Sequence, residues 1–237
     1  MAKLAIIIQA RMSSSRLPKK SLRLIGDKPL IFYVIERLRI LKLPIIVATS
    51  TDSSDDILVD YLKKLNYISV FRGDLNNVLN RYITAAEEFD VEKIIRITAD
   101  NPLVDIIALN NSLSLFRDYD YLDGIYQNGF IKGTGFELVT LNVLKSIKSN
   151  NLFHLEHVTA ALRENINYNP RFKKIKAPHY HKFINKIILT CDYEQDLDLL
   201  EKVFSFNNNS FNISIPDVIK LYERKPELFG LNNLLHR

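Results

Sequence analysis

The 237-residue sequence predicts a single α/β domain with a central, mainly parallel sheet and helices on both faces. Two observations predict this fold. Short apolar runs alternate with segments of helical periodicity through the first half of the chain, which is typical of right-handed βαβ units. The length suits one such domain, and with 47% hydrophobic and 25% charged residues the chain can bury a sizeable core.

The regular half contains four expected strands: Leu4–Ile8, Ile45–Thr49, Ile68–Phe71 and Lys93–Thr98. Pro29 opens the first helix between them. Ser53 or Ser54 can cap the second, whose core side is Ile57, Leu58, Tyr61, Leu62 and Leu65. Two more helices are expected at Val78–Ala86 and Ile106–Phe116. Ligands of parallel sheets bind beyond the carboxyl ends of the strands, so the loops after these strands are the candidate site.

The second half is less regular, since residues 124–135 hold four of the seven glycines and predict loops. Helices are expected at Leu141–Ser149 and His154–Asn165, before a basic stretch at 171–186. A strand at Ile187–Thr190 should return to the sheet. Further helices are expected near Gln195–Phe204 and Asp217–Arg224.

The composition bounds the compartment and the partners. Lys and Arg exceed Asp and Glu, for a net charge of +5, which suits a phosphate-rich ligand as well as nucleic acid. The single cysteine excludes an internal disulfide framework and fits a reducing compartment. No segment approaches the roughly 20 apolar residues of a membrane span. We therefore expect a cytoplasmic protein that contacts no membrane.

A cationic loop, Gln9-Ala-Arg-Met-Ser-Ser-Ser-Arg-Leu-Pro-Lys-Lys20, follows the first strand. Backbone N–H groups and serine hydroxyls can donate to phosphate oxygens there, while Arg11, Arg16 and Lys20 neutralise their charge. The loop is no Walker A motif, because no glycine precedes Gly26. On composition alone, a solvated basic loop is an equally good interpretation.

The loop stretch IIIQARMSSSRLPKKSL resembles the opening motif of the cytidylyltransferases, close to the spore-coat polysaccharide protein SpsF group. This group is related to enzymes acting on sialic acid and on 3-deoxy-manno-octulosonate. The resemblance continues through GDKPLIFYVIERL, FRGDLNNVLNRY, IIRITADNPLVD, FHLEHVTAAL and ILTCDYEQDLDLL, over roughly residues 3–205. It implies a Rossmann-like fold and Mg²⁺-dependent transfer of CMP from CTP to an anionic sugar or sugar-like acceptor. It also implies pyrophosphate release and a role in surface polysaccharide biosynthesis. It further implies a homodimer joined through a small acceptor lobe at about 124–186.

The resemblance also assigns the nucleotide site. It implies that Gln9, Ala10 and Arg11 bind the base and triphosphate together with the loop backbone. The phosphates are bound by Ser14, Ser15, Arg16 and Lys20. Arg16 and Lys20 also act on the leaving group. Ser13 and Lys19 stand where the family has glycines, and a positive φ at either would cost about 1 kcal/mol.

A second segment, Arg72, Gly73 and Asp74, is expected to close over the cytosine, and Arg96 is assigned to the nucleotide as well. Turn and helix-cap chemistry, with Asp74 or the following asparagines as the cap, explains most of the Arg72–Asp74 segment equally well.

Two carboxylates are candidate Mg²⁺ ligands. Asp100 lies just past a strand, because Pro102 excludes a continuing central strand, and Asp192 follows the expected strand Ile187–Thr190. Carboxylates at adjacent strand ends can share one Mg²⁺ ion, which takes few protein oxygens. Each could instead be a helix N-cap. The resemblance favours the metal, with a catalytic role for Asp100, and matches Asp196 to a further acidic position.

The acceptor side is assigned by resemblance to Glu137, Glu156 and His157. A plain surface charge is the alternative for Glu137. Gly135 and Leu155 stand where close relatives carry Asp and Arg, which leaves the acceptor's identity open.

The basic stretch at 171–186 permits a nucleic-acid interpretation, but an acceptor rim or subunit interface is favoured, so no nucleic-acid partner is expected. His179 and His181 form only a weak metal motif, and Cys191 is expected to be a packed residue. Two other functions stay open: a glycosyltransferase that uses a nucleotide-sugar, and an RNA-binding module. The glycosyltransferase is disfavoured because no Asp-x-Asp follows a strand in the first half.

Overall fold

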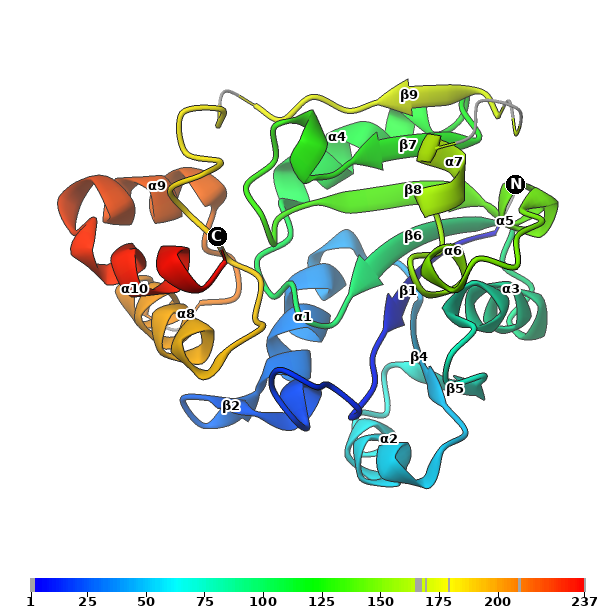
Figure 1. Cartoon of the computed structure of the whole chain (residues 1–237), viewed down its shortest axis with the longest axis horizontal. Helices are drawn as coiled ribbons and strands as arrows, with labels where there is room; N and C mark the ends of the chain where they lie inside the picture. Colours follow the sequence, from blue (N-terminus) through cyan, green and yellow to red (C-terminus); the bar gives the residue numbers. More distant parts are fainter. Residues whose placement is uncertain (1–2, 165–167, 169, 179, 209, 237) are drawn as a thin grey trace.

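The computed structural model describes residues 3–164, 168, 170–178, 180–208 and 210–236, and contains a seven-stranded sheet. Its order is β5-β4-β1-β6-β8-β7-β9 (Figure 1). The parallel part comprises β1 (Leu4–Gln9), β4 (Ile45–Ser50), β5 (Ser69–Gly73) and β6 (Lys93–Thr98). Antiparallel β8 (Phe136–Thr140) joins β6 to β7 (Tyr121–Gly124), and β9 (Phe172–Lys174) pairs parallel with β7. The predicted mainly parallel α/β fold is confirmed.

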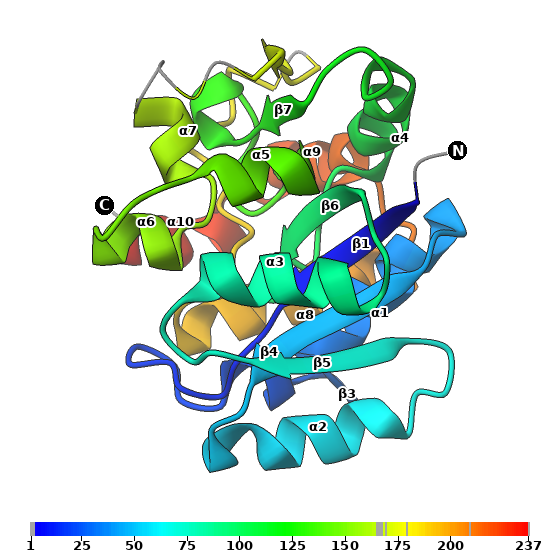
Figure 2. The same ribbon diagram turned by 90° about the vertical axis from the view of Figure 1, so that its right-hand side faces the viewer.

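Helices cover both faces of the sheet (Figure 2). One face of the sheet carries Ile6 and Ile8. The apolar residues of α1 (Leu30–Leu38), α2 (Asp56–Lys63) and α4 (Ile106–Leu115) pack on this face. The opposite face, with Ala5 and Ile7, is covered by α3 (Val78–Glu88), α5 (Leu141–Ser146) and α7 (Ala160–Glu164). Alternation along β1 thus sends successive side chains into two cores.

A third core joins the last helices to α1. It is built from α8 (Glu194–Phe206), α9 (Ile215–Arg224) and α10 (Glu227–Leu235). The rings of Tyr33 and Phe204 lie 4.4 Å apart in it. None of the helices that the described residues form has the length and apolarity needed to span a bilayer.

Short elements complete the chain. A hairpin of β2 (Leu24–Ile25) and β3 (Lys28–Pro29) turns at Gly26, whose φ of 58° suits glycine. The 3₁₀ turns are Lys20–Leu22, Arg39–Leu41, Ser53–Asp55 and Tyr126–Asn128, and α6 (Leu152–Glu156) is a short helix beside α3.

The first half follows the predicted order, with two corrections around α2. Ile57 is exposed instead of belonging to the core side. Neither Ser53 nor Ser54 caps α2, because both lie in a 3₁₀ turn capped by Asp52, and Asp55 occupies the N-cap position of α2.

The second half departs further from the predictions. Ile187–Thr190 is not a strand, because Ile188 makes only an isolated bridge to Lys132 in the glycine-rich loop. The helix expected at His154–Asn165 breaks into α6 and α7, since Val158 adopts a φ of 48° that no α-helix accommodates; Asn165 lies outside the described residues. The expected lobe segment, 124–186, contributes β8 and β9 to the central sheet. Strands β7, β8 and β9 and helix α10 were not predicted.

Candidate active site

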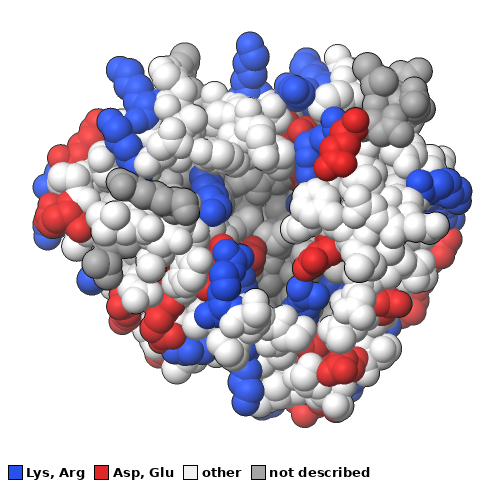
Figure 3. Space-filling view, in the orientation of Figure 1, with Lys and Arg blue, Asp and Glu red and all other residues white. Residues whose placement is uncertain are grey.

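A pocket of about 340 Å³ opens at the carboxyl ends of β1 and β6. In Figure 3 it is the hollow near the middle of the face, with Lys, Arg, Asp and Glu side chains gathered around it. Its wall includes most of the predicted site: Gln9, Ala10, Arg11, Ser14, Ser15, Arg16, Lys20, Arg96, Asp100, Glu156, His157 and Asp192. It also includes residues that were not predicted: Ser13, Ser21, Val78, Arg81, Thr98 and Ala99.

The loop after β1 folds back on its own backbone. The Met12 carbonyl accepts hydrogen bonds from the N–H groups of Ser14 at 3.0 Å and Lys19 at 3.1 Å. Lys19 has a φ of 58°, whereas Ser13 is not in the left-handed region. Of the two glycine replacements in the loop, therefore, only Lys19 carries the cost of about 1 kcal/mol.

Asp55 anchors this loop from beneath and was not recognised in the sequence. Its buried carboxylate accepts the Met12 N–H at 2.6 Å, the Thr49 hydroxyl at 2.8 Å and the Ser50 N–H at 2.9 Å. Burial alone would raise the pKa of Asp55, but hydrogen bonds from Ser50, Met12 and Thr49 hold that pKa below its ordinary value. An aspartate in a Ser/Thr-rich turn directly after a buried strand was the available signal.

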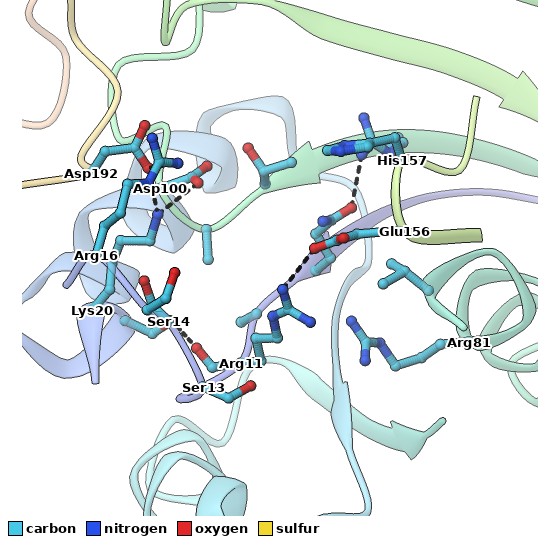
Figure 4. A pocket seen from close by; sticks show the side chains of 18 residues that line it. Arg11, Ser13, Ser14, Arg16, Lys20, Arg81, Asp100, Glu156, His157 and Asp192 are labelled. Atoms are coloured by element: carbon cyan, nitrogen blue, oxygen red, sulfur yellow. Dashed lines mark hydrogen bonds and ion pairs between the residues drawn. The ribbon is translucent and has the colours of Figure 1, made fainter. Parts of the chain in front are cut away.

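Lys20 joins the two predicted metal carboxylates. Its Nζ lies 2.9 Å from Asp100 Oδ2 and 3.1 Å from Asp192 Oδ1, and Arg16 Nη2 lies 3.0 Å from the same Asp192 oxygen (Figure 4). Burial alone would raise the pKa of Asp100 and lower that of Lys20. Attraction to Lys20 and hydrogen bonds from Thr98 and Lys20 together outweigh burial at Asp100, and Asp100 and Asp192 together outweigh it at Lys20. The pKa of Asp100 is therefore lowered, and that of Lys20 is raised.

The two carboxylates come together although only Asp100 follows a strand. The Cys191 N–H donates to the Asp100 carbonyl at 2.8 Å, which brings the loop carrying Asp192 to the end of β6. Asp192 itself is buried. These two side chains could hold a divalent cation through hard oxygen atoms; no cluster of three or more His, Cys, Asp or Glu placed for a metal occurs among the described residues.

The opposite wall carries Arg11, Glu156, His157 and Arg81 (Figure 4). Arg11 Nη2 lies 2.7 Å from Glu156 Oε1, so an ion pair links the loop to α6. Burial lowers the pKa of His157. Glu156 and His157, which were assigned to the acceptor, both line this pocket.

Arg81 is a buried cation that sequence reasoning missed. Its Nη1 donates to the Asp74 carbonyl at 2.7 Å, but its buried Nε has no hydrogen-bond partner, and no ion pair of Arg81 is found within the described part of the chain. Burial, and less strongly Arg11, lowers its pKa. The signal was an arginine on the apolar side of α3, between Val78 and Ala85.

Glu137 does not face the pocket and is not a surface charge, which corrects both interpretations. It is 2% exposed, and its carboxylate pairs with Arg96 and, at 2.7 Å, with Arg163. The hydroxyls of Tyr121 and Thr159 donate to it at 2.6 Å each. Burial alone would raise the pKa of Glu137, but Arg96 and Arg163 hold it below its ordinary value. Glu137 therefore supports Arg96, whose Nη2 donates to Gln9 Oε1 at 2.9 Å in the pocket wall.

The segment assigned to the base, Arg72–Asp74, lies outside the pocket wall. Arg72 donates to the carbonyls of Ser50 and Asp52 at 2.8 and 3.0 Å. Asp74 accepts the N–H groups of the next two asparagines, and Asn77 caps α3. In this structure the segment builds the turn that leads into α3.

The basic stretch lies around the edge strand β9, and none of its residues that the structure describes lines the pocket. Arg171 pairs with Asp120 at 2.8 Å, and Lys173 Nζ lies 5.3 Å from the Tyr119 ring centre. His179 lies outside the described residues. Cys191 is buried, and burial raises the pKa of its thiol, in keeping with a packed residue.

Comparison with known proteins identifies this architecture. The Cytidylyltransferase family model matches residues 5–221. The spore coat polysaccharide biosynthesis protein SpsF of Bacillus subtilis is 30% identical, over 93% of this chain and 94% of that protein. The 8-amino-3,8-dideoxy-manno-octulosonate cytidylyltransferase of Shewanella frigidimarina is 28% identical, over 85% of this chain and 84% of that protein. A solved cytidylyltransferase structure from Leptospira borgpetersenii superposes with a TM-score of 0.87 and 30% identity, covering 97% of both chains. The chain belongs to the cytidylyltransferase family.

Proposed function

We propose that this cytidylyltransferase transfers CMP from CTP to an anionic sugar or sugar-like acceptor, releases pyrophosphate, and requires Mg²⁺. The observation that carries the proposal is the Lys20 cluster, in which a cation from the loop after β1 contacts both strand-end carboxylates inside one pocket. The relatives named above support a role in surface polysaccharide biosynthesis.

The reaction needs no protein nucleophile. An acceptor oxygen attacks the α-phosphorus of CTP in line, the new P–O bond forms, and the bond to the β-phosphate oxygen breaks. Where the attacking oxygen is a hydroxyl, its proton passes to solvent water. Negative charge grows on the departing pyrophosphate. Arg16 and Lys20 are placed to stabilise that charge, and the Ser13–Ser15 segment offers hydroxyl and backbone donors to the other phosphate oxygens.

Asp100 and Asp192 would hold the Mg²⁺ ion. Two carboxylates in one wall fit an ion that takes few protein oxygens and completes its shell with water and phosphate oxygens. When bound, Mg²⁺ offsets negative charge on the reacting phosphate. The Lys20 ammonium contacts both carboxylates in this structure, and it would be available to a phosphate oxygen if Mg²⁺ supplied their counter-charge instead.

The remaining wall supports an anionic acceptor. The pocket is lined by five cations, Arg11, Arg16, Lys20, Arg81 and Arg96, against three carboxylates, Asp100, Glu156 and Asp192. Arg81 has no carboxylate partner among the described residues, and Arg11 is held only by the half-exposed Glu156. A carboxylate or phosphate on the acceptor can displace Glu156 from Arg11.

We further propose that the enzyme acts as a homodimer through the 124–186 segment, which analytical ultracentrifugation tests.

The deciding experiment is pyrophosphate release with each of the four NTPs across an acceptor panel of nonulosonic acids, octulosonates, sugar phosphates and phosphonates. We expect release that depends on CTP, Mg²⁺ and one acceptor class. Equal release with all four nucleotides would overturn the choice of CTP. Transfer from a nucleotide-sugar without pyrophosphate release would favour a glycosyltransferase.

A further inference from the structure

The last helix, α10, packs against α8, and its Asn232 contacts Asp196, four residues after Asp192. Phe229 anchors α10 in the core that it shares with α8 and α9, and its ring lies 5.3 Å from that of Tyr222. This helix lies beyond residues 5–221, the part of the chain that the family model matches. Any support that α10 gives to the site is therefore additional to the pattern that defines the family.

Two polar side chains from this end of the chain are buried against Asp196. Asn232 is 1% exposed, and its Nδ2 donates to Asp196 Oδ1. The His236 side chain is 0% exposed, and its Nε2 lies 3.1 Å from Asp196 Oδ2. Buried polar groups pair in this way because an unmade hydrogen bond costs about 1–3 kcal/mol.

Asp196 in turn holds the backbone of a pocket carboxylate. Its Oδ2 accepts the N–H of Asp192 at 2.6 Å and that of Tyr193 at 2.8 Å. This buried carboxylate thus fixes the main chain at Asp192 and helps to set the direction of the Asp192 side chain, together with Lys20 and Arg16.

The nitrogen of His236 that carries the hydrogen follows from the neighbours of Nδ1, which are Lys132 and, at 4.0 Å, Asp192 Oδ2. Lys132 Nζ lies 3.1 Å from His236 Nδ1. A lysine ammonium has only donors, so Nδ1 accepts, and Nε2 therefore carries the hydrogen that is donated to Asp196. A continuous chain of hydrogen bonds thus runs from Lys132, in the glycine-rich loop, through His236 and Asp196 to Asp192.

We propose that Asn232 and His236 are positioning residues that hold Asp192 in place through Asp196, so that α10 completes the nucleotidyl-transfer site. The inference rests on the proposed function, because it takes Asp192 to be a metal-holding carboxylate. Removing a side chain that supports a metal ligand commonly lowers metal affinity or activity about 10–100-fold.

The test compares three variants of the full chain in the CTP- and Mg²⁺-dependent pyrophosphate assay. His236→Leu removes both ring nitrogens, His236→Gln keeps an amide donor at similar reach, and Leu234→Ala changes an exposed residue of the same helix. For His236→Leu we expect kcat to fall about 10-fold or more and the Mg²⁺ concentration for half-maximal rate to rise, with KM for CTP altered less than about 3-fold. His236→Gln should recover most of the rate, and Leu234→Ala should match the wild type.

A fourth variant covers the case in which His236→Leu does not fold. Asn232→Asp keeps the side-chain shape but faces the Asp196 carboxylate with a like charge, so it should raise the Mg²⁺ requirement of protein that circular dichroism shows to be folded. Wild-type kcat and Mg²⁺ dependence in the His236 and Asn232 variants, with only a lower melting temperature, would overturn the inference. If Asp192→Asn kept full activity, the metal assignment in the proposed function would fail instead.

Discussion

Two ion-pair clusters share the sheet, and they differ in access to solvent. The open cluster, Lys20 with Asp100, Asp192 and Arg16, lies in the pocket, and its Arg16 side chain is 54% exposed. The closed cluster is centred on Glu137, a buried carboxylate behind the pocket wall, whose two oxygens are both occupied by donors from Arg96, Arg163, Tyr121 and Thr159. The carboxylates of the open cluster can exchange their partners for a ligand, whereas Glu137 cannot. The same residue types therefore serve chemistry in one place and the fold in the other.

Glu137→Gln should give the largest effect, on stability. It leaves Arg96 and Arg163 without their counter-charge, and breaking a buried pair costs about 3–5 kcal/mol. Urea unfolding measures the loss. Glu156→Gln is the control, because the Glu156 side chain is 48% exposed and its pair with Arg11 should contribute only about 0–1 kcal/mol.

The contribution of Glu137 should also depend on pH. Its folded pKa lies below the ordinary 4.5, so its stabilisation is present above pH 4.5 and is lost as the pH falls through the folded value. Equal stability losses in the Glu137 and Glu156 variants would contradict the division into closed and open clusters.

Asp100→Asn and Asp192→Asn should act on turnover instead. Each removes a hard oxygen from the open cluster, and we expect kcat to fall about 100-fold or more, or about 2.7 kcal/mol of barrier. Melting temperatures should stay close to that of the wild type. Near-normal activity in either variant would assign that aspartate to a structural role.

Arg16→Ala and Lys20→Ala should weaken both CTP binding and turnover, because charge-assisted contacts to phosphate contribute about 1.5–3 kcal/mol. The matched control is the double change Lys173→Ala with Lys174→Ala on edge strand β9, outside the pocket. That control should leave CTP affinity unaltered in isothermal titration, while acceptor KM or the dimer equilibrium changes. The reverse pattern would place the nucleotide elsewhere.

Asp123→Asn should stabilise the protein at neutral pH. Asp123 pairs in register with Glu137, is buried with its Oδ1 lacking a partner, and burial together with Glu137 raises its pKa to about 6. Because the folded pKa of Asp123 is raised, its contribution to folding stability is fully present below the ordinary pKa of 3.8. That contribution is lost as the pH rises to about 6 and folded Asp123 gives up its proton. We expect a gain of about 1–3 kcal/mol at pH 7.5 and a smaller gain at pH 4.5. A gain independent of pH would show that the buried charge of Asp123 is not what destabilises the folded protein.

Periodicity was sufficient to predict the first half of the fold. Strands such as β1 and β6 are apolar runs between amphipathic helices, so their existence and order follow from local pattern. Strand β7 escaped prediction because Asp123 and Gly124 lie within its four residues. Ile187–Thr190 is apolar, but among the described residues it meets only Lys132, in an isolated bridge, and no strand. Such outcomes depend on tertiary neighbours rather than on the segment itself.

The site shows the same limit. The loop from Gln9 to Lys20, with Asp100 and Asp192, was predicted because motif and chemistry agree there. Arg81 was missed because a helix pattern hides a charged residue on a buried face, and Glu137 was misplaced because the sequence does not show that Arg163 and Thr159 close over it.

The central claim is that the open cluster is a binding site for CTP. The most direct measurement is the thermal unfolding of the wild type with Mg²⁺ and each of the four nucleotides in turn. CTP at about 100-fold over its Kd should add roughly 2.7 kcal/mol of stability, more than ATP, GTP or UTP at the same concentration. Equal shifts with all four nucleotides, or no shift with CTP, would contradict the claim.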